Sequence, residues 1–142
     1  MEMLDKVHGA HANVFIQYEG SFQDLGLAIE KGLHIPTLRF ENIEEEPYDE
    51  VGYAEVLGFE IELKPNNKWP NYKYSMSITT TDSFQEIFNN RMFDISLWLA
   101  RYLSLVCELT TMVENSDGQT GQLFYWNPTT EKRESSFVNI QI

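Results

Sequence analysis

The side chains with the clearest capacity for chemistry are the acids of one segment. Residues 19–62 contain twelve Asp and Glu but only two bases, Lys31 and Arg39, so the segment has a net charge of −10. The remaining residues contain ten acids and eight bases, a net charge of −2. Paired carboxylates can act as general acid and base where a cleft separates their pKa values. A dense acidic segment can also bind the Lys and Arg side chains of another protein.

We expect binding rather than catalysis, because the acids occur both in a predicted loop (residues 41–50) and on one side of a predicted strand (residues 53–64). Two tyrosines interleave with them, and large aromatic side chains are typical interface anchors. Five of the predicted partner-binding residues would steer the approach: Glu44, Glu45, Glu46, Asp49 and Glu50. The other five would form the contact: Tyr48, Tyr53, Glu55, Glu60 and Glu62. The alternative is a solvated surface that only keeps the protein soluble.

Other residue types give weaker indications of chemistry. His8 and His11 have HxxH spacing but lack a third ligand at useful spacing, and His34 is isolated, so no metal site is predicted. Cys107 lies in an apolar run, where a small core residue is expected rather than a reactive thiolate. The chain has no phosphate-binding loop and no GxSxG motif. We therefore predict a protein that is not an enzyme and has no cofactor.

Size and charge limit the classes of partner. With 142 residues, 42% hydrophobic and 13% aromatic, the chain is expected to form a single domain over residues 1–142, with residues 1–12 as a loose lead-in. A single cysteine allows no internal disulfide, which favours a cytoplasmic protein. The formal charge of −12 disfavours nucleic acid and anionic membranes as partners. The sequence leaves the oligomeric state open.

The first third of the chain predicts a strand, a helix and a second strand. Residues 13–18 are rich in β-branched and aromatic side chains, and residues 37–40 resemble another short strand. Between them, apolar residues recur at helical spacing over residues 22–31. Ser21 is positioned to cap this helix, and Gly32 is expected to end it.

The middle of the chain alternates between apolar and polar residues. We predict one long strand over residues 53–64 with a bulge near Gly58, so that Ala54 and Val56 point inward while the acids point outward. A turn over residues 65–71 would lead into an antiparallel strand at residues 72–79.

The last part predicts two helices and a final strand pair. A short helix would follow Asp82 or Ser83 and contain Phe84, Ile87 and Phe88. A long, mostly buried helix is expected over residues 95–113, because its polar face is narrow. Residues 122–126 and 137–142 would pair. The fold class predicted is α+β, a mainly antiparallel sheet with two or three helices packed on one face.

The chain combines its length, its acidity, a local acidic cluster and the lack of a catalytic motif. It also contains the segments NVFIQYEG, GFEIEL and DISLWLARYLSLVCELTTMV. In these features the chain resembles the bacterial immunity proteins of contact-dependent growth inhibition. The resemblance implies a tight, stoichiometric complex with a cognate toxin domain, often a basic nuclease. The acids would then occupy the site where nucleic-acid phosphates bind.

Two other functions remain open from the sequence. An adaptor or subunit would bind another protein through exposed aromatic residues, for which Trp69, Tyr125 and Trp126 are the candidates. A small ligand-binding domain would need a deep pocket lined by polar groups such as His34, a carboxylate and Arg101.

Overall fold

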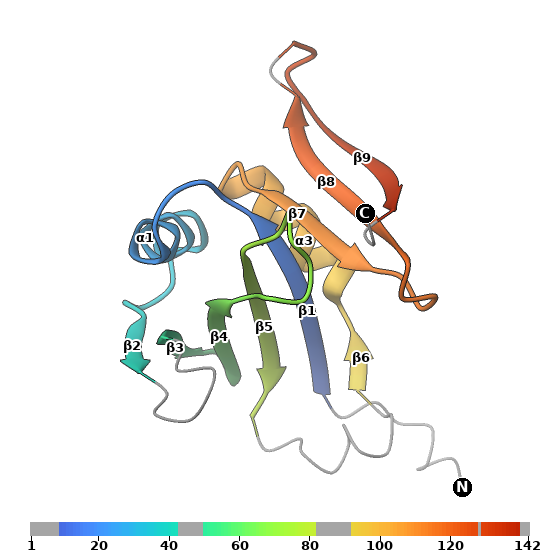
Figure 1. The fold of residues 1–142 in the computed structure, drawn as a ribbon. Helices are drawn as coiled ribbons and strands as arrows, with labels where there is room; N and C mark the ends of the chain where they lie inside the picture. Colours follow the sequence, from blue (N-terminus) through green and yellow to red (C-terminus); the bar gives the residue numbers. More distant parts are fainter. Residues whose placement is uncertain (1–8, 43–49, 82–91, 128, 140–142) are drawn as a thin grey trace, which may run out of the picture.

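The computed structural model describes residues 9–42, 50–81, 92–127 and 129–139. The strands are β1 (Gly9–Gln17), β2 (Arg39–Asn42), β3 (Glu50–Val56), β4 (Phe59–Pro65), β5 (Tyr74–Thr80), β6 (Met92–Asp94), β7 (Thr110–Glu114), β8 (Thr120–Asn127) and β9 (Lys132–Asn139). They form one sheet in the order β2-β3-β4-β5-β1-β7-β8-β9, and β6 also pairs with β1 (Figure 1). All neighbouring strands are antiparallel except β1 and β6. The predicted α+β class with a mainly antiparallel sheet is confirmed.

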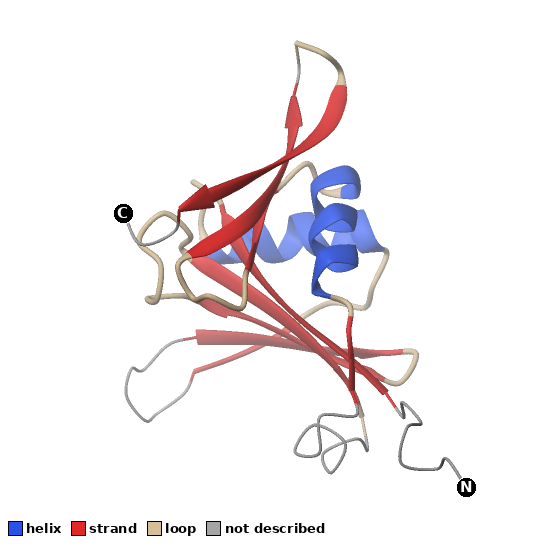
Figure 2. Ribbon diagram, turned by 90° about the vertical axis from the view of Figure 1, so that its right-hand side faces the viewer, coloured by secondary structure: helices blue, strands red, loops and turns tan. Residues whose placement is uncertain are grey.

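Helices α1 (Phe22–Leu33) and α3 (Ser96–Val106) lie on one side of this sheet, which we call the inner face (Figure 2). The main core fills the space between them and the sheet. Its most buried side chains come from α1, α3 and the inner face of the central strands, including Leu25, Leu103, Ile16 and Leu63. Alternation along each strand places these residues inward and their neighbours outward.

A second, smaller cluster lies on the other side of the sheet, the outer face. Phe15 and Met112 are register partners on β1 and β7, and Trp69 and Tyr72 from the β4–β5 connection pack over them. Trp69 is only 9% exposed. This cluster covers the outer face around β1 and β7, whereas the outer face of β2–β4 carries mainly polar side chains.

Helix α1 begins where the sequence indicates, because Ser21 Oγ accepts a hydrogen bond from Asp24 N at 3.1 Å. The prediction that Gly32 ends the helix was wrong, since His34 is the C-terminal cap, with a left-handed backbone at φ 55°. Gly32 serves a different purpose: a Cβ there would collide with Cys107 Sγ. Its missing side chain allows α1 and the end of α3 to approach closely.

The predicted long strand with a bulge was also wrong. Residues 50–65 form two strands, β3 and β4, joined by a tight turn at Leu57 and Gly58. A bulge and a two-residue turn both shift the alternation by one residue, so the pattern by itself could not separate them. The inward direction of Ala54 is confirmed, because it is 9% exposed and belongs to the main core.

The helix predicted over residues 95–113 ends at Val106. Glu108 has a left-handed backbone (φ 54°), and residues 110–114 form β7 between β1 and β8. Thr110 and Thr111 are β-branched, and strands favour such residues. Thr111 Oγ1 donates to Ala100 O at 2.8 Å, which joins β7 to the helix beneath it.

Several smaller predictions can also be compared with the structure. Residues 9–12 belong to β1 and not to a loose lead-in, and Ala12 is buried. The helix predicted after residue 82 lies outside the described residues. The β4–β5 pair is confirmed. β8 pairs with a last strand as predicted, but that strand, β9, covers residues 132–139 instead of 137–142, and residues 140–142 lie outside the described residues. β8 and β9 extend away from the helices (Figure 1). Among the described helices, neither is long and apolar enough to cross a bilayer.

Candidate functional site

The outer face of β2, β3 and β4 collects most of the predicted acids that the structure describes. In the β3–β4 register, Tyr53 lies opposite Glu62 and Glu55 lies opposite Glu60. Residues that face each other across an antiparallel pair point to the same side of the sheet. Glu41 of β2 joins this set, because its neighbour Arg39 pairs with Tyr53 two residues along the strand. We call Glu41, Tyr53, Glu55, Glu60 and Glu62 the acidic face.

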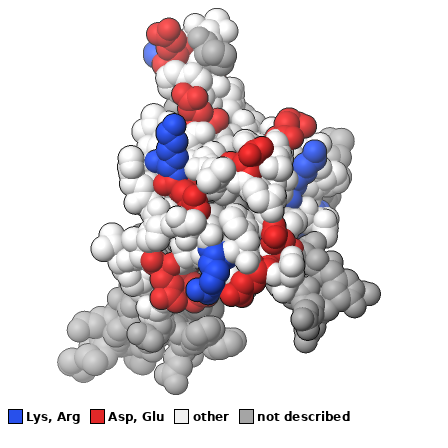
Figure 3. Space-filling view, turned by 90° about the vertical axis from the view of Figure 1, so that its left-hand side faces the viewer, with Lys and Arg blue, Asp and Glu red and all other residues white. Residues whose placement is uncertain are grey.

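Two basic residues moderate the charge of this face. Arg39 Nε donates to Glu41 Oε1 at 2.9 Å, and its guanidinium carbon is 5.9 Å from the centre of the Tyr53 ring. Lys64 Nζ is 3.6 Å from Glu62 Oε1. In Figure 3, acidic side chains lie on both sides of one basic group in the lower part of the view, beside the grey residues.

Glu55 and Glu60 lack an ion pair of this kind among the described residues, although Arg39 lines a pocket together with both of them. They are direct cross-strand partners. Like charges in directly opposite positions destabilise a sheet. These two carboxylates therefore remain available for a cationic group from outside the chain.

A pocket of about 250 Å³ opens on the acidic face. It is lined by Pro36, Thr37, Arg39, Tyr53, Ala54, Glu55 and Glu60. The pKa of Tyr53 is raised above its ordinary value by burial and by the negative charges of Glu62, Glu41 and Glu60, although Arg39 opposes them. The phenol therefore stays protonated, and it can donate a hydrogen bond beside carboxylates that accept them.

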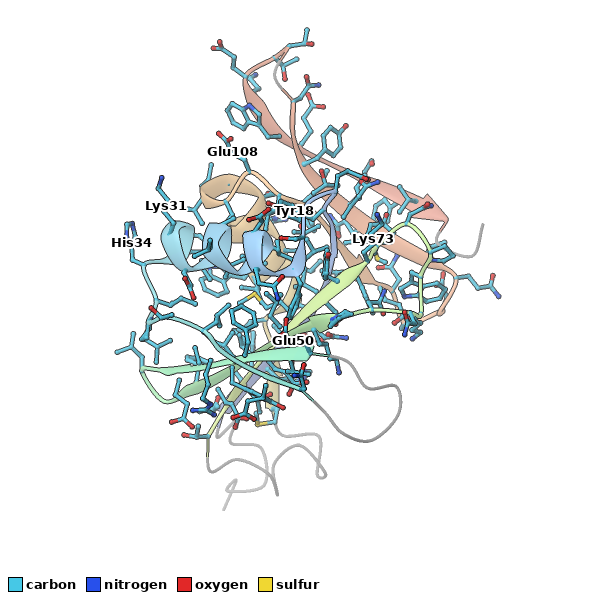
Figure 4. The ribbon with its side chains drawn as sticks, turned by 60° about the vertical axis from the view of Figure 1, so that its left-hand side comes forward. Tyr18, Lys31, His34, Glu50, Lys73 and Glu108 are labelled. Atoms are coloured by element: carbon cyan, nitrogen blue, oxygen red, sulfur yellow. The ribbon has the colours of Figure 1, made fainter. Side chains whose placement is uncertain are left out.

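The structure does not bring Glu50 into this set. The Gln23 side-chain amide of α1 donates to Glu50 Oε1, so Glu50 lies on the side of the sheet that faces α1 (Figure 4). An even-numbered position on β3 points inward, whereas Tyr53 and Glu55 point outward. The predicted residues Glu44, Glu45, Glu46, Tyr48 and Asp49 lie outside the described residues.

A second pocket, of about 450 Å³, lies on the inner side of the same β3–β4 hairpin. Its walls come from α3, the segment after α1, and strands β3 to β5. It is lined by Leu33, Ile35, Val56, Leu57, Phe59, Ile61, Met76, Ile78, Ile95, Trp98, Leu99 and Tyr102. No charged side chain belongs to this lining. We call it the apolar pocket.

The rim of the apolar pocket is exposed. Leu57 at the hairpin tip is 94% exposed, Trp98 is 54% exposed and Tyr102 is 38% exposed. The rings of Trp98 and Tyr102 stack, with centroids 5.4 Å apart. None of these three exposures could be predicted from the sequence, because Trp98 and Tyr102 lie in the helix expected to be mostly buried and Leu57 lies in the strand predicted over residues 53–64. Gly58 between two alternating runs was the only local signal for a tight hairpin turn, because leucine is not a residue that such turns favour.

The residues proposed for the alternative functions are not gathered in one place. Trp69 is buried, which removes it as an exposed anchor, while Trp126 is 37% exposed on β8. His34 caps the end of α1, where Figure 4 shows it beside Lys31, and the Arg101 guanidinium packs 5.7 Å from the centre of the Phe124 ring. Neither residue lines either pocket.

The described part of the chain contains no group of three His, Cys, Asp or Glu side chains arranged to hold a metal ion. In chemical terms, the acidic face can accept hydrogen bonds from cationic side chains, and the apolar pocket can take up apolar groups. No protein-family model and no curated protein sequence matches this chain.

Proposed function

We propose that this protein is an inhibitor of the immunity type, which binds a basic protein domain through its acidic face and blocks that domain's activity. The partner would be a cognate toxin domain, with a nuclease as the favoured class. A nuclease binds phosphates through Lys and Arg, and carboxylates arranged on a sheet can occupy the same groups. The proposal contains no catalytic step for this chain.

The observation that carries the proposal is the cross-strand pair Glu55 and Glu60, neither of which forms an ion pair with a described residue. Like charges in directly opposite positions of an antiparallel strand pair destabilise the sheet. Stability alone would therefore favour opposite charges or neutral residues at these two positions. A partner's Lys or Arg would relieve this repulsion in the complex. Tyr53 lies next to the pair on the same face and supplies a large aromatic surface of the kind that anchors interfaces.

The first experiment identifies the partner by affinity capture from the native organism at low salt. The captured domain is then purified, and its dissociation constant for this protein is measured over a range of salt concentrations. We expect a basic domain whose affinity falls as salt rises. A nuclease partner should lose its activity at one equivalent of this protein.

The decisive variant is the double substitution Glu55→Lys/Glu60→Lys. Each carboxylate replaced by an ammonium group would repel the partner's cations, so we expect a loss of affinity of about tenfold or more and a weaker salt dependence. The matched control is Glu108→Lys/Glu131→Lys, which makes the same charge change at two exposed acids away from the acidic face that form no ion pair with a described residue. Equal affinity loss in both double variants would show only a net-charge effect and would reject the acidic face as the interface.

A further inference from the structure

We propose that the apolar pocket holds a bulky apolar side chain of the partner, and that Leu57 is the contact residue at its rim. The inference rests on the proposed function, because it assigns a second contact to the same basic partner. The partner segment would carry a large aliphatic or aromatic residue next to Lys or Arg. Its apolar side chain would enter the pocket, and its cations would meet Glu55 and Glu60.

The first observation concerns Leu57, because both its exposure to solvent and its backbone conformation are unfavourable for a leucine. It is 94% exposed, and its backbone is left-handed with φ 52°, followed by Gly58 at φ 80°. These are the two central positions of a tight hairpin turn with positive φ, where Asn-Gly or Asp-Gly is preferred. A branched apolar residue with positive φ is an outlier. An asparagine would suit both the backbone and the solvent better, so the leucine side chain serves neither folding nor solubility.

The second observation is the exposed half of α3. Leu99 and Leu103 are buried against the sheet, but Trp98 and Tyr102 face outward across the mouth of the pocket. Trp and Tyr are the residue types most enriched at interface positions that dominate binding. The floor beneath them is the main core itself, with Ile61, Met76 and Ile78 nearly buried. Among the described residues, none covers the pocket where these exposed aromatics gather.

The charges on the same hairpin indicate the occupant. Glu55 and Glu60 are two residues before and three residues after Leu57, and they point to the acidic face while the pocket opens on the other side. A second copy of this chain carries the same formal charge of −12, so long-range repulsion opposes its approach, whereas a basic partner is attracted. A small apolar molecule would fill the floor but leave Leu57 and Trp98 exposed. A protein segment with an apolar residue between basic ones would contact all three features. Its apolar side chain would lie on the floor of the pocket and against its rim, and its cations would lie next to the carboxylates.

The test uses random 12-residue peptides displayed on phage and selected against the purified full chain. Enriched peptides are synthesised, and their affinity is measured by fluorescence anisotropy against the wild type and the variant Leu57→Asn. We expect the peptides to combine a bulky apolar residue with Lys or Arg. We expect Leu57→Asn to weaken their binding by about tenfold or more, as is typical for the loss of a central interface residue. Thermal unfolding should show that Leu57→Asn is at least as stable as the wild type.

The control is Leu27→Gln, which removes an exposed leucine of α1 outside the apolar pocket and should bind the peptides like the wild type. The proposal is overturned if no peptide is enriched, if the peptides lack a bulky apolar residue, or if Leu57→Asn binds them as tightly as the wild type does. It is also overturned if sedimentation shows that the free protein self-associates and that Leu57→Asn abolishes the association.

The two proposals fail in different ways. Peptides whose Lys and Arg are replaced by Gln test the acidic face alone. If these neutral peptides bind as tightly as the basic ones, and Leu57→Asn still weakens them, the apolar pocket is supported and the acidic face is rejected.

Discussion

Cys107 shows how a single side chain is set by its immediate packing. It caps the end of α3 and lies against the backbone of Gly32, whose missing side chain leaves room for the sulfur. Burial raises the pKa of the thiol from 9.0 to about 11, because the thiolate loses its solvation. The residue is therefore a small apolar contact between the ends of two helices and not a nucleophile.

We predict that Cys107 reacts slowly with a disulfide reagent at pH 8 in the native state and rapidly after unfolding in guanidinium. The free energy of unfolding should fall as the pH rises from about 9 to about 11. The sign follows because the unfolded thiol ionises first, so the unfolded state releases its proton while the folded state keeps it. Reactivity and pH-dependent denaturation measure both effects. Cys107→Ala is the control, and equal slopes for it and the wild type in this pH range would contradict the assignment.

At the scale of the elements, the start of α3 depends on one carboxylate. Asp94 Oδ1 accepts a hydrogen bond from Ser96 N at 2.9 Å, and Ser96 Oγ accepts one from Asn13 N at 2.9 Å. Burial would raise the pKa of Asp94, but its hydrogen bonds with the side chain and backbone of Ser96 outweigh that and lower it, with help from His11. The junction of β6 and α3 is thereby attached to β1.

We predict that Asp94→Ala lowers the free energy of unfolding by about 1 kcal/mol, because the first turn of α3 loses its acceptor. Asp94→Asn keeps an acceptor and should lose much less. Urea denaturation measures both variants. Since the carboxylate pKa is lowered in the folded state, the stability from its charge should disappear as the pH falls through that lowered value, and Asp94→Asn should lack this part of the acid dependence. An alanine variant as stable as the wild type would contradict a stabilising role for the hydrogen bond from Ser96 N to Asp94.

The β3–β4 hairpin is the element on which both functional proposals depend. Its outer side carries the opposed pair Glu55 and Glu60, and its inner side forms one wall of the apolar pocket. One two-residue turn thus determines the positions of the acidic face and of the apolar rim.

We predict that Glu60→Lys raises the free energy of unfolding by up to about 1 kcal/mol, since an opposite-charge pair with Glu55 replaces a repulsive one. Glu60→Gln should give a smaller gain, because it only removes the repulsion. Thermal unfolding at low salt measures both variants. If the lysine variant is less stable than the glutamine variant, the carboxylates do not interact across the strands. A gain in stability together with a loss of partner affinity would mark a residue kept for binding.

At the scale of the whole molecule, the formal charge of −12 opposes folding through self-repulsion. The arrangement is uneven, because the base-poor segment 19–62 supplies α1 and the β2–β4 end of the sheet. The remaining elements carry nearly balanced charge.

We predict that the melting temperature of the free protein rises as salt increases from about 10 mM to about 500 mM, because salt shortens the screening length from about 30 Å to a few ångströms. Glu55→Lys/Glu60→Lys changes the formal charge from −12 to −8, since each substitution adds two charges. Its melting temperature should therefore depend less on salt. The control Glu108→Lys/Glu131→Lys has the same net charge and breaks no ion pair with a described residue, so an equal response in the two variants would show that net charge, and not the local pair, sets the salt effect.

The sequence by itself determined the direction of side chains within local segments. Alternation placed Glu55, Glu60 and Glu62 on one side and Ala54 on the other, and Ser21 with the helical spacing after it defined the start of α1. Both follow from backbone geometry over a few residues, which a local pattern records directly. The α+β class could be predicted for the same reason.

Only the tertiary structure decided where elements end and which apolar residues stay exposed. The segment after Val106 extends as β7 because it pairs on one side with β1, which is distant in sequence, and on the other with the following strand β8. Trp98 and Leu57 resemble core residues locally, and they are exposed because no described element covers that end of the core. Burial depends on the packing of distant segments, and for this reason the apolar pocket could not be predicted from the sequence pattern.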